Sequence, residues 1–243
     1  MQVIEQKPEQ FFEKTWINAL SSANYRRKFL VAAILFTAVL LYYPYFFISI
    51  QQRFTSITLN DPVLNILPSL NMSAYIFPLI YATVGLGIYR FVQSPPLFLL
   101  FLWGCLFFSL SRIITITLVP LNPPHGLVPL VDPVLVAFYR HNQITKDLFY
   151  SGHTGSVFLI YLILRNKWEK VFALTATVLV AVLLLIQHIH YTIDVVFAPV
   201  FVYITFILAK KITRVSLEPQ QRIFFPLANL QWLYLKIMER KIK

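Results

Sequence analysis

The sequence predicts an all-α integral membrane protein with six transmembrane helices and both termini in the cytoplasm. Of the 243 residues, 58% are hydrophobic and only 13% are charged, whereas soluble domains are roughly 45–50% apolar and about a quarter charged. Several apolar runs reach or approach the roughly 20 residues needed to cross a hydrocarbon core. The lysines and arginines gather at the ends of these runs. Together these observations indicate one membrane domain without a soluble partner domain.

The first predicted span covers residues 29–50 and follows Arg26, Arg27 and Lys28. It starts too late and is too long for an ordinary signal peptide, so it is expected to remain as a transmembrane helix. The other five spans are expected at about residues 74–91, 96–119, 149–164, 171–187 and 191–209, the last of which is followed by Lys210 and Lys211.

The basic residues predict the orientation of these spans, because cytoplasmic segments hold an excess of lysine and arginine. With the N-terminus inside, 17 of the 21 basic residues fall in inside segments. Arg53, Arg140 and Lys146 fall outside, and Arg112 lies within the third span. Both termini are therefore predicted to be cytoplasmic, and segments 51–73, 120–148 and 188–190 face the lumen, the periplasm or the cell exterior.

The two ends of the chain are expected to lie at the membrane surface. Residues 1–28 form a cytoplasmic segment in which apolar residues such as Phe12 and Trp16 recur at helical spacing, which is typical of an interfacial helix. Residues 29–209 form the transmembrane domain that carries the candidate site, and residues 210–243 form a basic amphipathic cytoplasmic tail. A solvated tail is the alternative. The net charge of +11 favours anionic lipid headgroups over nucleic acid as a partner.

Few ionisable residues lie near a span, and such residues are costly enough that function is the default hypothesis for them. They are Arg112 in the third span, Asp147 and His153 at the start of the fourth, and His188, His190 and Asp194 around the start of the sixth. All except Arg112 fall near the same outer surface. The only cysteine, Cys105, lies in an apolar run, so no intrachain disulfide can form.

The spacing of these residues suggests acid–base and nucleophilic chemistry on a phosphate. His153 falls in the first turn of a predicted helix, where backbone amides attract anions. His190 and Asp194 are four residues apart and share a face if the sixth helix has begun, so that the carboxylate orients the imidazole. The other ring nitrogen is then free to act as a nucleophile or base. The planar fork of Arg112 suits a phosphate.

The segments SGHT (residues 151–154) and HYTIDVV (residues 190–196) resemble the two catalytic motifs of the sphingomyelin synthase family, within the type 2 phosphatidic acid phosphatase superfamily. The segment RIITITLVP (residues 112–120) is similar to a third motif of that family. The resemblance covers roughly residues 60–205, including the six-span plan. Two departures bear on the substrate. Thr145-Lys146-Asp147 stands where the family usually has Cys-Gly-Asp, and Phe197-Ala198-Pro199 introduces a proline after the second motif.

The resemblance implies a lipid headgroup phosphotransferase. It implies that His190 attacks the phosphorus, that Asp194 orients His190, and that His153 protonates the leaving oxygen. The implied binding residues are Arg112, Asp147, Ser151, His188 and Tyr191, of which Asp147 would support His153. The implied donor is a glycerophospholipid carrying phosphocholine or phosphoethanolamine, and the acceptor is ceramide or a diacylglycerol-like alcohol. No metal or cofactor is implied, and a homo-oligomer is left open.

Other interpretations of the same residues remain. A lipid phosphate phosphatase or phospholipase C-like hydrolase would use the same triad with water as acceptor, and a non-catalytic protein would only bind lipid in the bilayer. A metal site could use His153, His188, His190 and Asp194, although two histidines at i and i+2 point apart on a helix. A transporter would need polar residues spread towards the midplane. His125 and His141 are expected to be interfacial residues without a catalytic role.

Overall fold

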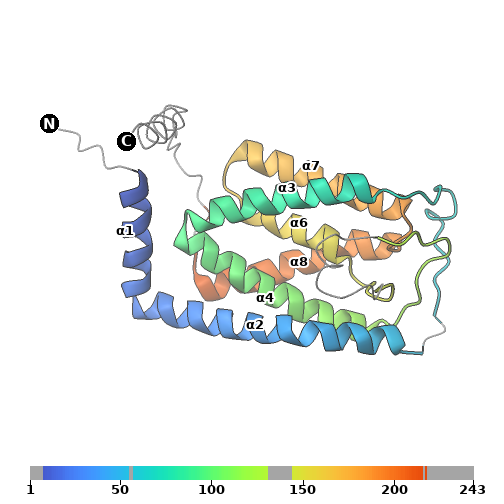
Figure 1. Cartoon of the computed structure of the whole chain (residues 1–243), viewed down its shortest axis with the longest axis horizontal. Helices are drawn as coiled ribbons and strands as arrows, with labels where there is room; N and C mark the ends of the chain where they lie inside the picture. Colours follow the sequence, from blue (N-terminus) through green and yellow to red (C-terminus); the bar gives the residue numbers. More distant parts are fainter. Residues whose placement is uncertain (1–7, 55–56, 131–143, 216, 218–243) are drawn as a thin grey trace, which may run out of the picture.

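The protein is described by a computed structural model for residues 8–54, 57–130, 144–215 and 217, with side chains from residue 15 onward. Every regular element in this part of the chain is a helix, and no strand is present there. The helices, shown in Figure 1, are α1 (Pro8–Ser21), α2 (Ala23–Gln52), α3 (Ser73–Val92), α4 (Pro95–Leu118), α6 (Gly152–Ile163), α7 (Lys167–Ile186) and α8 (Thr192–Thr213).

Five of the described helices, α2, α3, α4, α7 and α8, are long and apolar enough to cross a membrane. Helix α6 stands where the fourth of the six spans was predicted, but it has 12 residues. At about 1.5 Å of rise per residue it is too short to cross a hydrocarbon core of about 30 Å by itself. The structure therefore supports five spanning helices. The fourth predicted span corresponds to a short apolar helix instead.

The bundle has two distinct ends (Figure 1). Helices α2, α3, α4, α6, α7 and α8 run side by side along its long axis, and α1 lies across one end of α2. We call this the α1 end; it also carries the α3–α4 and α6–α7 connections and the last turn of α8. The opposite end, which we call the loop end, carries residues 53–72, 119–151 and 187–191 so far as they are described.

Helix α6 lies inside the bundle, where it packs against α3, α4, α7 and α8. Small residues allow this close packing. A Cβ atom at Gly155 would lie 2.7 Å from the Phe108 ring of α4 and 3.1 Å from Val202 of α8. Glycine at such a contact lets apolar helices approach closely. The packing places the N-terminus of α6, with His153, in the interior of the loop end.

The observed helix ends differ from the predicted spans at both ends of the chain. Helix α2 begins at Ala23, so the basic residues at positions 26–28 form its second turn instead of preceding it. Ser22, with extended backbone angles, separates α1 from α2. Helix α8 continues to Thr213, four residues past the expected end at Ala209, because Lys210 and Lys211 are good helix formers and stabilise its C-terminal turn. The predicted tail lies mostly outside the described residues.

The outer surface of the bundle is apolar along its length. Large hydrophobic side chains are exposed on the long helices, including Ile34 and Leu41 on α2, Val178 on α7 and Val200 on α8. Exposed apolar surface on this scale is unusual for a soluble monomer and is suited to lipid chains. Together with the five long apolar helices, it indicates an integral membrane protein.

Candidate active site

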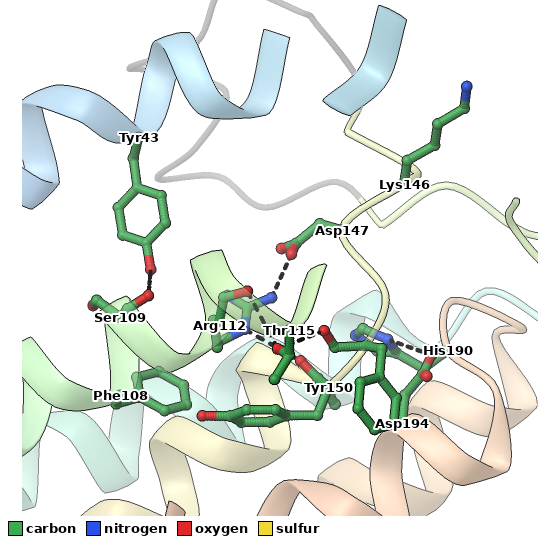
Figure 2. A network of polar contacts seen from close by, with 12 residues as sticks. Tyr43, Phe108, Ser109, Arg112, Thr115, Lys146, Asp147, Tyr150, His190 and Asp194 are labelled. Carbon is green, nitrogen blue, oxygen red and sulfur yellow. Dashed lines mark hydrogen bonds and ion pairs between the residues drawn. The ribbon is translucent and has the colours of Figure 1, made fainter. Parts of the chain in front are cut away.

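Figure 2 shows a network of polar contacts at the loop end that includes His190 and Asp194. The distance from His190 Nδ1 to Asp194 Oδ2 is 3.3 Å, and the two side chains are 2% and 0% exposed. This contact directs Nδ1–H at the carboxylate and leaves Nε2 with a free lone pair. The other oxygen, Asp194 Oδ1, is buried and has no hydrogen-bond partner among the described residues. The carboxylate can therefore accept a further hydrogen bond, and its negative charge can stabilise the imidazole ring when that ring becomes positively charged.

The helical turn assumed for this pair is only partly formed. Helix α8 begins at Thr192, with Tyr191 as its N-cap, so His190 precedes the helix. The contact forms because Asp194 is the third residue of α8, and its Oδ2 also accepts the backbone N–H of Tyr191 at 3.0 Å. A carboxylate in this position caps the helix and interacts favourably with its dipole. Asp194 thus holds both the helix start and the preceding histidine.

The two histidine motifs are joined by a backbone hydrogen bond. The N–H of Ser151 donates to the carbonyl oxygen of Asp194 at 3.1 Å. Ser151 is also the N-cap of α6, and its hydroxyl accepts the N–H of Thr154. His153 is the second residue of α6 and is half-buried. The first turn of α6 is thereby fixed next to the start of α8.

Arg112 of α4 joins the first histidine motif, at Gly152, to the segment before α6 (Figure 2). It is buried, its Nε donates to the carbonyl oxygen of Tyr150 at 3.2 Å, and its Nη2 forms an ion pair with Asp147. The neighbouring hydroxyl of Thr115 donates to the carbonyl oxygen of Phe149 at 2.9 Å. These hydrogen bonds satisfy backbone carbonyl groups in the non-helical segment that leads into α6. The carboxylate of Asp147 is engaged by Arg112, whereas the family resemblance implied support of His153.

Gly152 is required by the position of Arg112. A Cβ atom at residue 152 would lie 2.6 Å from both Cζ and Nη1 of Arg112, a distance that real Cβ atoms essentially never show. The guanidinium group therefore rests directly on the backbone at the N-terminus of α6. Two of its five N–H donors are used by Tyr150 and Asp147. The donors on Nη1 lie beside the N-terminal amides of α6, which makes this region a suitable place for an anion.

The ring of Tyr150 packs in the interior beside the candidate site. It is completely buried and lies parallel to the ring of Phe201, with the ring centroids 4.9 Å apart. Its hydroxyl lies 2.6 Å from that of Ser111. An aromatic side chain with its polar tip satisfied is stable in an apolar interior. Tyr150 thereby anchors the segment before α6 between α4 and α8.

His188 bonds to two loops and not to the His190–Asp194 pair. Its Nδ1 is 2.9 Å from the carbonyl oxygen of His125, and its Nε2 is 3.3 Å from that of Leu67. Its backbone adopts φ of 54°, which is uncommon for a residue other than glycine. The ring thus joins two loops, and the phosphate-binding role that the resemblance implies for it stays a prediction.

Tyr191 likewise contacts backbone groups of the loop end. Its hydroxyl donates to the carbonyl oxygen of Asn122 at 2.9 Å and accepts the N–H of Leu59 at 3.2 Å. The ring is buried between the loops and helix α8. Its hydroxyl group is therefore bonded to backbone groups of the loop end, and its predicted contact with a substrate stays a prediction.

Asp61 is a structural residue of the loop end that the sequence analysis did not select. Its Oδ2 accepts the N–H of Thr192 at 2.6 Å, and its Oδ1 accepts the Thr192 hydroxyl at 3.0 Å. It also accepts the backbone N–H groups of Val63 and Leu64. Burial alone would raise the pKa of Asp61, but these hydrogen bonds outweigh it and lower the pKa. The only signal in the sequence is the Asp-Pro pair, which is typical of a turn.

The structure brings together most of the predicted site residues through direct bonds: Arg112 with Asp147, His190 with Asp194, and Ser151 with Asp194. It places His188 and Tyr191 in loop contacts. His125 is exposed, and His141 lies outside the described residues. Among the side chains that the structure describes, no three His, Cys, Asp or Glu residues are grouped so that they could hold a metal ion. The proposed four-ligand metal site therefore has no geometric support there.

Residues 146–211 match a family model described as PAP2 superfamily C-terminal. The matched segment contains Asp147, both histidine motifs and Asp194, and it ends near the end of α8. This match supports the type 2 phosphatidic acid phosphatase superfamily and, with it, an activity of the lipid phosphatase or phosphotransferase type. No curated protein matches the chain.

Proposed function

We propose that the protein is a lipid headgroup phosphotransferase that works through a phosphohistidine. It moves phosphocholine or phosphoethanolamine from a glycerophospholipid to ceramide or a similar lipid alcohol. The observation that carries this proposal is the buried His190–Asp194 pair, bonded through Ser151 to the helix that presents His153. Arg112 lies against that same helix terminus. A nucleophile, an acid and an anion-binding group are thus held by one rigid set of contacts.

In the first half of the reaction, Nε2 of His190 attacks the phosphorus of the donor lipid. The bond between phosphorus and the diacylglycerol oxygen breaks, and His153 gives its proton to that oxygen. The imidazole of His190 becomes positively charged as the P–N bond forms. Asp194 stabilises this charge, and its second buried oxygen is available to strengthen the interaction.

In the second half, the hydroxyl group of the acceptor attacks the phosphorus of the phosphohistidine. His153, now neutral, takes the hydroxyl proton, the P–N bond breaks and His190 is restored. The two half-reactions use the same groups in opposite directions. Atoms and charge therefore balance without a metal ion or an oxidant.

The phosphate oxygens are held by Arg112 and by the N-terminal amides of α6. Asp147 keeps the guanidinium group in place through the ion pair described above. His188 and Tyr191 support the loops around the site, because their polar atoms already contact backbone groups. Ser151 acts as the cap of α6 and as the link to Asp194.

Burial of the nucleophile favours transfer to a lipid alcohol over hydrolysis. The side chain of His190 is only 2% exposed and belongs to a bundle whose outer surface is apolar, so an acceptor that comes from the bilayer is favoured over one that comes from bulk water. A phosphatase with the same triad is the second candidate function, and the superfamily match is compatible with both. The two differ in the acceptor alone.

The site is proposed to face the lumen, the periplasm or the cell exterior. Those of the predicted cytoplasmic basic residues that the structure describes lie at the α1 end, and the candidate site lies at the loop end. The donor lipid would then come from the outer leaflet.

A direct test uses the purified full chain and phosphatidylcholine or phosphatidylethanolamine labelled in the headgroup, with and without ceramide. We expect labelled phosphosphingolipid when ceramide is present, and loss of more than 100-fold in rate for His190→Ala, since acid–base effects alone supply about 10²- to 10⁴-fold. His125→Ala, an exposed histidine of the same end, is the matched control and should retain activity. Free phosphocholine or phosphoethanolamine released at the same rate with and without ceramide would favour the hydrolase. Retained turnover in His190→Ala would contradict both.

A further inference from the structure

Helix α2 reaches the candidate site through its C-terminal part, although it lies outside the matched family segment of residues 146–211. It packs against α4, where Phe46, Ile50 and Ile116 form one buried apolar cluster. On α4, Ile116 follows Arg112 by about one helical turn. The two helices are therefore in close contact next to the candidate phosphate-binding residue.

Two hydrogen bonds from α2 to the backbone of α4 lie on either side of Arg112 in the sequence. The Tyr43 hydroxyl donates to the carbonyl oxygen of Ser109 at 3.3 Å, as Figure 2 shows. At the end of α2, Nη1 of Arg53 donates to the carbonyl oxygen of Ile116 at 3.0 Å. These bonds fix α2 relative to the part of α4 that carries the guanidinium group.

Gln51, in the last turn of α2, holds the segment that leads to Asp147. Its Oε1 accepts the backbone N–H of Thr145 at 3.0 Å and that of Lys146 at 3.4 Å. Its Nε2 donates to the Thr145 hydroxyl at 3.1 Å. One amide side chain thus makes three hydrogen bonds to two consecutive residues that are more than 90 positions away in the chain. These bonds fix the backbone immediately before Asp147.

Asp147 is thereby held between two helices. Figure 2 shows its carboxylate directed at Arg112, whereas the preceding Lys146 side chain is directed away. The Lys146 ammonium group donates to the carbonyl oxygen of Arg53 at the end of α2. The two residues before Asp147 are therefore bonded to the C-terminal end of α2, and Asp147 itself is bonded to α4.

We propose that Gln51 is a positioning residue of the candidate active site. It fixes the backbone before Asp147, and Asp147 in turn keeps the guanidinium group of Arg112 in the orientation that binds the phosphate of the donor lipid. This inference rests on the proposed function for the identity of the ligand. Groups that act on a substrate must be placed accurately, because a displacement of about 1 Å can cost a large part of the rate.

The kinetic test compares Gln51→Ala with Gln52→Ala, the exposed neighbouring glutamine, in the headgroup-transfer assay with the purified full chain. Gln51→Ala should raise KM for the donor lipid about fivefold, the effect of one net hydrogen bond, and should leave kcat within about twofold, as expected for lost ground-state binding. Gln52→Ala should change neither constant. A merely structural role would lower the amount of folded enzyme, and with it the apparent kcat, at an unchanged KM.

A double variant tests whether Gln51 acts through Asp147. Asp147→Asn should raise KM for the donor about tenfold or more, because the ion pair with Arg112 loses its charge. Gln51→Ala should then raise KM no further in the Asp147→Asn background, since residues that act through one contact are not additive. Additive effects of the two substitutions, or an unchanged KM in Gln51→Ala alone, would overturn the inference.

Amide hydrogen exchange separates this inference from the proposed function, because it needs no substrate. Gln51→Ala should speed exchange of the Thr145 and Lys146 N–H groups about tenfold, and exchange in α4 and α8 should stay as in the unaltered protein. Unchanged exchange at residues 145 and 146, or faster exchange in all helices, would overturn the inference. Absence of headgroup transfer by the unaltered protein would overturn the proposed function, and with it the role of Gln51 in donor binding, whereas the exchange result still shows whether Gln51 holds the segment.

Discussion

The two ends of the bundle use charge in opposite ways. Among the described side chains, the loop end has three basic and three acidic residues, and most of them are bonded to partners inside the protein. They are Arg53, Arg112 and Lys146, and Asp61, Asp147 and Asp194. Counted over its described side chains alone, the α1 end has ten basic residues and a single acidic one, Glu169.

This difference indicates that the burial of the charges, more than their number, distinguishes the end that carries the candidate site. Buried charges must be paired or used, because an isolated one is expensive to remove from water. At the loop end the pairs are internal and hold the histidines in place. At the α1 end most charges are exposed and available to the membrane surface. The first end is suited to chemistry, and the second to orientation and lipid binding.

The largest expected effect is a difference between the two ends of the bundle in their access to an impermeant reagent. In a Cys105→Ser background, we place single cysteines at Ile66, which is 81% exposed at the loop end, and at the exposed Lys167 of the α1 end. In sealed vesicles with the exoplasmic face outward, an impermeant thiol reagent should label position 66 and spare position 167. The reverse pattern would place the candidate site on the cytoplasmic leaflet. Labelling of both positions after detergent treatment is the control for reactivity.

Gly152→Ala is expected to disturb the loop end strongly, because its Cβ would overlap the Arg112 guanidinium group at 2.6 Å. Overpacking of this kind costs about 1–3 kcal/mol in the free energy of unfolding. We expect in addition at least a tenfold loss of transferase rate, because Arg112 must move. Thermal unfolding and the headgroup-transfer assay measure the two effects.

Gly85→Ala is the matched control for this glycine. A Cβ at position 85 meets nothing within 4 Å, and the residue is exposed in the middle of α3. The substitution should leave activity unchanged and raise stability by about 0.5–1 kcal/mol. Equal behaviour of the two variants would contradict the close contact between Arg112 and α6.

Asp61→Asn is expected to have a moderate effect that depends on pH. Because folding lowers the pKa of Asp61 below its ordinary value of 3.8, the carboxylate contributes stability above that value, and the contribution is lost as the pH falls through the lowered pKa. At pH 7 the substitution should cost about 1–3 kcal/mol, as expected for lost hydrogen bonds to a charged group. The difference from the unaltered protein should shrink in acid. A difference that grows below pH 4 would contradict this role.

The smallest effect is expected at the α1 end, where Arg90 pairs with Glu169. The Arg90 side chain is 36% exposed, and pairs of this kind contribute about 0–1 kcal/mol. Glu169→Gln should therefore change the unfolding temperature only slightly and should leave the transfer rate unchanged. A loss above about 2 kcal/mol would show that this end is less tolerant of charge changes than the comparison implies.

The helices were predictable because apolar runs and basic residues mark their ends directly. The length of α6 was not. The apolar run from Phe149 suggested a longer span, but Phe149, Tyr150 and Ser151 form the non-helical link that contacts Thr115, Arg112 and Asp194. An apolar residue that serves such a link cannot be distinguished by sequence pattern from one that faces lipid.

The candidate site was predictable in its residue types and only partly in its contacts. Asp194 follows His190 at a spacing that suggested contact, and the contact exists although the helix starts two residues later. Asp61 could not be selected, because its partner Thr192 is 131 residues away in the chain. The contacts of His188 could not be predicted from the sequence, because they depend on the fold of the loops around it.

The most direct test of the account is to trap the phosphohistidine. Purified protein is mixed with a donor phospholipid labelled at its phosphate, denatured within one turnover, and analysed for acid-labile, base-stable label. We predict label on His190, its loss when ceramide is added before denaturation, and its appearance in the lipid product. His190→Ala should carry no label, and His125→Ala should carry it normally. Turnover without any labelled protein, or label that persists in His190→Ala, would contradict a covalent mechanism through this residue.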